Sequence, residues 1–138
     1  MPYSYLIDLE RDVVFSKIWG TVTDDEVVDH ATGLRADPRF DPVLNQILDM
    51  RELSDLQVTS HGIRKLAQLV PFHPSARRAF LVGTGQAEAL SRVLFTYTDA
   101  GVDQYTLFRE LPPAMESVGL DPKTPWPDQA PDNTYGPG

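Results

Sequence analysis

The 138-residue sequence contains no cysteine, and this absence removes several classes of protein and site. Without thiols the chain has no disulfide, no thiolate zinc centre and no cysteine nucleophile, and nothing indicates an oxidising compartment. Long apolar runs are also missing, because none approaches the roughly 20 residues that span a bilayer. The opening residues lack a basic stretch followed by an apolar one, so no signal peptide is predicted. We therefore expect a cytoplasmic protein without membrane insertion.

Basic residues are few: 12 lysines and arginines stand against 20 aspartates and glutamates, a net charge of −8. Such a surface repels phosphate backbones and anionic lipids, which argues against nucleic acid or a membrane as partner. Hydrophobic residues at 41% and charged residues at 23% are ordinary for a globular protein. A chain of this length is expected to form one domain with its own core.

The chain opens with two predicted strands. Residues 3–9 alternate between apolar and polar side chains, as a half-buried edge strand does. Residues 13–19 are apolar on both faces, which indicates a more central strand that ends at Gly20. The polar break at residues 10–12 is short, so the two strands must run antiparallel.

A capping box from Thr23 to Glu26 predicts the start of the first helix. Its core stripe is Val27, Ala31 and Leu34, and Asp37–Pro38 ends it. The acidic first turn suits the positive end of the helix dipole, so we assign no metal to it.

The centre of the chain reads as a strand (43–48), a polar loop (49–59) and an amphipathic helix. The apolar stripe of that helix is Ile63, Leu66, Ala67 and Val70. In open α/β sheets, ligands bind at such strand-to-helix loops. Asp49 and Arg51, at the end of the predicted strand, are therefore binding candidates, unless they simply pair with each other or with nearby backbone.

The later elements are a buried strand at 77–84, a helix at 86–100, a strand at 104–109 and a short helix that Pro112–Pro113 begin and Gly119 ends. We predict an α/β fold: a single mixed, mainly parallel five-stranded sheet with an N-terminal antiparallel hairpin and four helices. This domain spans residues 1–120. Five prolines mark residues 121–138 as a tail, disordered or docked through Trp126.

Three stretches of residues 3–120 resemble the SpoIIAA-like family, a branch of the STAS (sulfate transporter and anti-sigma factor antagonist) fold. They are YLIDLERDVVFSKIWGTVTDDE, LDMREL, and RRAFLVG with Arg92 in the next helix. Anti-sigma factor antagonists carry a phosphorylatable serine in a sequence of the form Asp-Ser-Ser-Gly-Leu. The matching residues here are Thr59, Ser60, His61, Gly62 and Ile63, so the resemblance implies phosphorylation at Ser60. A cap formed by Thr59 or Ser60 is the structural alternative.

Signals for catalysis are missing. The histidines His30, His61 and His73 have no metal-ligand spacing and are expected to be surface or partly buried residues. No nucleophile elbow or phosphate-binding loop is present. The stretch Gly83–Glu88 only half-matches a dinucleotide fingerprint, because Glu88 stands where a third glycine belongs. We expect no enzyme, no cofactor and no metal.

The preferred hypothesis is a non-enzymatic STAS-like binding or regulatory module with a protein partner. Its surface would be residues 49–62, with candidate residues Asp49, Arg51, Thr59, Ser60, His61 and Gly62. The alternative is a small carrier or sensor of an apolar, lipid-like ligand, lined by Phe72, Phe80, Phe95 and Phe108. Extra apolar residues on the third predicted helix, Val93 and Phe95, also predict a homodimer.

Overall fold

The computed structural model describes residues 2–69, 72–73, 75–83, 85 and 105–127, without the side chains of residues 60, 63, 67 and 105. The strands are β1 (Tyr3–Asp8), β2 (Val13–Thr23), β3 (Asn45–Gln57), β4 (Arg78–Leu81) and β5 (Tyr105–Phe108). The described helices are α1 (Asp24–Ala36), α2 (Ser60–Leu69) and α4 (Leu111–Ser117).

The five strands form one sheet in the order β1-β2-β3-β4-β5. The hairpin β1–β2 is antiparallel and every other neighbour pair is parallel, which confirms the predicted mixed, mainly parallel α/β sheet. The helix expected at residues 86–100, and with it the proposed dimer surface, lies outside the described residues.

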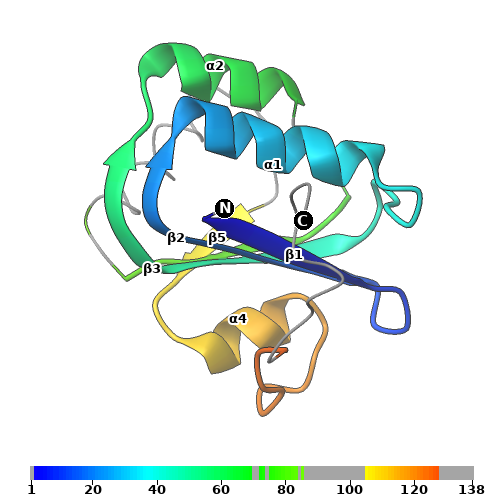
Figure 1. Cartoon of the computed structure of the whole chain (residues 1–138). Coiled ribbons are helices and arrows are strands. Elements are labelled where there is room, and N and C mark those ends of the chain that lie inside the picture. The colour runs from blue at the N-terminus through cyan, green and yellow to red at the C-terminus, as the bar shows by residue number, and fades with distance from the viewer. Residues whose placement is uncertain (1, 70–71, 74, 84, 86–104, 128–138) are drawn as a thin grey trace.

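Helices cover both faces of the sheet (Figure 1). On one face α1 and α2 lie side by side over a core that includes Tyr3, Ile18 and Met50. The other face carries α4, and we call it the α4 face. Its core contains Phe15, Ile47, Leu81 and Met115. The central strands β2, β3 and β4 thus alternate their apolar side chains between two layers, as the pattern of a central strand requires.

The start of α1 agrees with the predicted capping box. The Glu26 carboxylate accepts a hydrogen bond from the Thr23 backbone N–H at 2.8 Å. The predicted stripe residues Val27, Ala31 and Leu34 are all buried.

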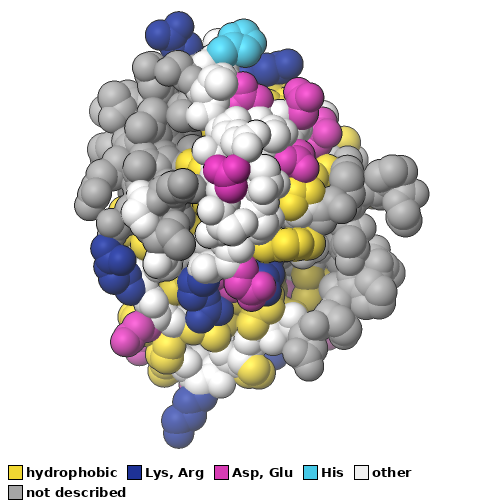
Figure 2. All heavy atoms as spheres, turned by 60° about the vertical axis from the view of Figure 1, so that its left-hand side comes forward, with side chains coloured by type: hydrophobic (Ala, Val, Ile, Leu, Met, Phe, Trp, Pro, Cys, Tyr) yellow, Lys and Arg dark blue, Asp and Glu magenta, His cyan; other side chains and the backbone are white. Residues whose placement is uncertain are grey.

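Two predicted boundaries are wrong, because β2 and β3 continue beyond them. Gly20 does not end β2: it adopts a φ of +68° within the strand, which runs on to Thr23. Residues 49–57 are not a loop but the second half of β3, paired with the end of β2. Figure 1 shows these two strand ends rising toward the starts of α1 and α2. Figure 2 turns this end forward, and acidic side chains gather on its upper part.

The beginning of the tail, up to residue 127, packs on the domain through Trp126, which was one of the two alternatives that the sequence left open. The indole of Trp126 meets the Phe15 ring edge-on, with 5.4 Å between the ring centroids. Both side chains belong to the core of the α4 face.

His30 is buried, against the expectation of a surface or partly buried residue. It lies on α1 between the rings of Tyr3 and Tyr5, with centroid distances of 5.6 and 6.1 Å. Its Nε2 has no hydrogen-bond partner among the described residues. Burial, and then the nearby charge of Arg78, lower the pKa of His30 from 6.5 to about 4. A helical pattern alone did not reveal this, since position 30 is adjacent to the stripe.

This burial predicts a loss of stability in mild acid. The pKa of His30 is lower in the folded than in the unfolded chain, so the unfolded chain binds the proton first. The contribution of neutral His30 to the free energy of unfolding is complete above pH 6.5. It is lost as the pH falls toward 4, and the total loss is about 3 kcal/mol. His30→Leu should flatten urea-unfolding free energies across this window. Equal slopes for wild type and His30→Leu would contradict the assignment.

Candidate functional site

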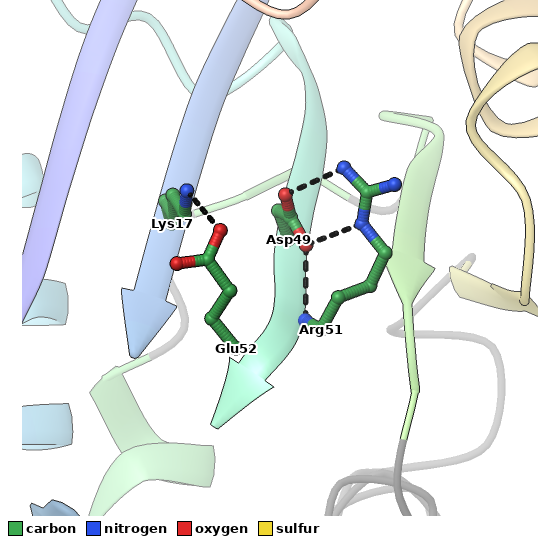
Figure 3. Close-up of polar contacts among 4 residues, drawn as sticks. All are labelled: Lys17, Asp49, Arg51 and Glu52. Atoms are coloured by element: carbon green, nitrogen blue, oxygen red, sulfur yellow. Dashed lines mark hydrogen bonds and ion pairs between the residues drawn. The ribbon is translucent and has the colours of Figure 1, made fainter. Parts of the chain in front are cut away.

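Asp49 and Arg51 form a closely bonded pair on β3. The Asp49 carboxylate accepts three hydrogen bonds from Arg51, from its backbone N–H, its Nε and its Nη2, each at 3.0 Å (Figure 3). The Asp49 side chain is 2% exposed, whereas that of Arg51 is 40% exposed. These bonds raise the pKa of Arg51. The expectation that the two residues pair with each other is therefore confirmed, and only Arg51 is left facing outward.

The backbone explains why this pair forms. Lys17 lies opposite Asp49 in the register, but Trp19 lies opposite Glu52, so β3 contains one more residue than β2 over this step. Such a β-bulge interrupts the ladder and leaves a backbone N–H to be satisfied otherwise. Within the bulge, the Asp49 carboxylate accepts a hydrogen bond from the backbone N–H of Arg51.

Gly83 follows β4 and lies against the same bulge. A Cβ placed on Gly83 would come within 3.3 Å of the Arg51 Cα. Close approach of two backbones accounts for this glycine without any phosphate-binding role.

Lys17 and Glu52 form a second ion pair nearby, from neighbouring strands (Figure 3). Lys17 Nζ lies 2.8 Å from Glu52 Oε2, and the Glu52 side chain is 65% exposed. This pair is far more solvated than Asp49–Arg51, so water screens most of its attraction.

The start of α2 is joined to the start of α1 by Asp24. Its carboxylate accepts the Thr59 backbone N–H at 2.7 Å and the Thr59 hydroxyl at 2.5 Å. Thr59 also caps α2, because its Oγ1 accepts the Gly62 N–H at 3.3 Å. The capping alternative thus holds for Thr59. The two hydrogen bonds from Thr59, and to a smaller extent the charge of His61, lower the pKa of Asp24.

Gly62 makes room for this contact. A Cβ added to Gly62 would overlap the carboxyl group of Asp24. The glycine therefore has a packing reason, independent of any motif.

The predicted site residues fall into two groups. Asp49 shares the α4 face with Leu81, its register partner, and carries Arg51 with it. Thr59, Ser60, His61 and Gly62 lie at the start of α2, on the opposite side of the sheet. No contact joins the two groups within the described residues. Sequence reasoning missed Asp24 as a member of the second group, having assigned it only to the first turn of its own helix.

We also searched the described part of the chain for a metal site, a membrane-spanning helix and an apolar pocket. There, no three histidine, aspartate or glutamate side chains are placed to hold a metal ion. None of the described helices is long and apolar enough to cross a membrane. Of the aromatic residues expected around an apolar ligand, Phe72 and Phe80 are buried in the core and Phe108 packs against it. Phe95 lies outside the described residues.

Comparison with known proteins supports the fold. No family model and no curated protein matches the chain. One solved structure that resembles it is an uncharacterised protein of the DUF3478 family from Shewanella loihica PV-4, described as having a SpoIIAA-like fold. The likeness has a TM-score of 0.55 at 18% identity and covers 83% of this chain and 91% of the other. The chain thus has a SpoIIAA-like fold.

The contact of Asp24 with the start of α2 predicts that Gly62→Ala changes stability in the direction opposite to that of most helix glycines. In most helices Gly→Ala stabilises by about 1 kcal/mol. Gly62→Ala should instead destabilise by about 1–3 kcal/mol, because the new Cβ overlaps Asp24. In an Asp24→Ala background the same change should become stabilising. Chemical denaturation of the four proteins in this cycle tests the prediction, and a Gly62→Ala cost that is independent of residue 24 would contradict it.

The two ion pairs of Figure 3 should differ in energy. Arg51→Ala leaves the buried Asp49 carboxylate without its counter-ion and should cost about 2 kcal/mol after allowance for the partial exposure of Arg51. Lys17→Ala, the matched control, should cost less than about 1 kcal/mol. Urea unfolding of both variants measures the difference. Equal costs would show that Asp49 is stabilised by something other than Arg51.

Proposed function

We propose that this chain is a non-enzymatic binding or regulatory module that recognises a protein partner through the start of α2. The observation that carries the proposal is the contact of Asp24 with Thr59. It ties the first turn of α2 to the first turn of α1 and so holds the exposed His61 in a defined position. Rigidly placed polar groups on regular elements are what recognition needs.

Arg51, on the α4 face, is a second candidate contact that is separate from the start of α2. Its guanidinium is fixed on one side by the Asp49 carboxylate and exposed on the other. An arginine whose geometry is already set loses little freedom on binding, and arginine is enriched among the residues that dominate interfaces. Asp49 itself is buried, so in this proposal it orients Arg51 and does not touch the partner.

The surrounding charge supports a partner with a basic surface. Asp24 and Asp25 lie in the first turn of α1 and Asp55 lies near the end of β3. Figure 2 shows acidic side chains gathered at this end of the molecule. Opposite charge across an interface speeds encounter and selects between partners.

Phosphorylation of Ser60 is the regulatory part of the proposal. Ser60 is the first residue of α2 and follows Thr59, which holds Asp24. A phosphate on the first residue of α2 would add negative charge to the helix start that the Asp24 carboxylate contacts, and repulsion between like charges would weaken that contact.

A photo-crosslinking residue in place of His61 tests the module directly. In cells of the source organism, it should give a discrete conjugate with a partner protein. The same residue at Thr32, exposed on α1, is the matched control and should give none. Asp24→Ala should reduce the yield at position 61 several-fold while circular dichroism stays unchanged. Equal conjugation from both positions would contradict the proposed surface, and a co-purifying apolar molecule in native mass spectrometry would favour a carrier.

A further inference from the structure

The outer surfaces of α1 and α2 carry charges of opposite sign. On α1, the exposed residues Asp25 and Asp29 stand one helical turn apart and form what we call the acidic row. On α2, the exposed residues His61, Arg64 and Lys65 share one face in the same way, and we call them the basic row. The two helices follow parallel strands and lie side by side, so the two rows are neighbours on the helix layer.

The basic row is a local departure from the charge of the whole chain. The net charge is −8, yet the sequence contains no aspartate or glutamate between Asp55 and Glu88. Figure 2 shows basic and histidine side chains at the upper end of the molecule, where α2 lies in Figure 1, with acidic side chains below them. Positive charge is thus concentrated on one helix of an otherwise acidic protein.

The stability of α2 does not account for this charge. A helix is stabilised by acidic residues in its first turn and basic residues in its last turn, and α1 follows that rule with Asp24, Asp25, Glu26 and Arg35. In α2 the first turn has no acidic residue, and the last turn has no basic residue. Within the described residues, no ion pair joins Lys65 to a carboxylate. Neither the helix dipole nor a described ion pair therefore explains Lys65.

We propose that the partner recognised at the start of α2 carries an acidic segment, and that this segment docks along the basic row. The inference rests on the proposed function, because it names the chemistry of that same partner. Leu66 packs against the core beneath α2, so the row on the other side of the helix is turned outward. The contact of Asp24 with Thr59 fixes the first turn of this helix and with it the position of the row.

The acidic row decides which class of macromolecule fits. A nucleic acid or an anionic bilayer presents negative charge over a wide area, so it would meet Asp25 and Asp29 as well as the basic row. A protein can present carboxylates to α2 and cations to α1 within one surface. Two adjoining rows of opposite sign also fix the orientation of such a partner and speed its encounter with this chain.

A defined acidic probe tests the basic row. Amide shifts of the isotope-labelled full chain are followed at low ionic strength as a decapeptide of alternating glutamate and alanine is added. The peptide should shift signals of α2, and Lys65→Glu should weaken its binding about fivefold, as expected for the loss of one exposed ion pair. Lys65→Arg keeps the charge and should bind like wild type. Lys123→Glu, an identical change at an exposed lysine beyond α4, should leave binding unchanged.

Several outcomes would overturn the inference. They are peptide shifts spread over the cations of the whole surface, equal effects of Lys65→Glu and Lys123→Glu, and equal binding of a single-stranded DNA decamer at α2. Shifts of α2 signals that depend on protein concentration alone would assign the row to a second copy and would overturn it as well.

The crosslinker at position 61 separates this inference from the proposed function. In cells, Lys65→Glu should lower the yield of the partner conjugate several-fold, whereas Lys123→Glu should not. A conjugate whose yield ignores residue 65 would sink the acidic segment and leave the recognition surface standing. Peptide binding at α2 without any conjugate from position 61 would support the basic row and contradict the proposed function instead.

Discussion

The parallel pairing of β2 with β3 is the constraint on which the rest of the structure depends. It runs from Val13 opposite Asn45 to Thr23 opposite Gln57. Each strand then passes almost directly into a helix, so the register of the last pair decides where α1 and α2 begin relative to each other. The contact between Asp24 and Thr59 follows from that register. A register slip of one residue would turn the side chains of one strand to the opposite face of the sheet and would move the starts of α1 and α2 apart.

The elements that local patterns determine could be read from the sequence, and those that depend on pairing could not. Alternation gave β1, and the capping box gave the start of α1, because both signals lie within a few residues. The second half of β3 was missed because its bulges place the buried Leu53 and the half-buried Leu56 three residues apart, which breaks the two-residue period. Asp24 was missed as a site residue because its partner, Thr59, is 35 positions away.

The start of α2 differs in sequence from the Asp-Ser-Ser-Gly-Leu pattern of the anti-sigma factor antagonists that it resembles. In that pattern an aspartate precedes the serine, whereas here the position is occupied by Thr59. The carboxylate of Asp24, the first residue of α1, accepts two hydrogen bonds from Thr59. The positive end of the α2 dipole thus still faces a carboxylate. At 18% identity the likeness to a solved structure concerns the fold alone. The function must therefore be argued from the contacts of these residues.

Gly62 indicates which property of this helix start matters most. Glycine in a helix costs about 1 kcal/mol relative to alanine, so stability alone would favour a side chain here. A Cβ at position 62 would displace the Asp24 carboxyl group, and with it the hydrogen bonds to Thr59. The chain thus accepts a weaker α2 in return for a fixed junction between two helix starts. Local rules are broken in this way where a defined arrangement of polar groups is needed, which is the physical ground for proposing recognition at this end of the molecule.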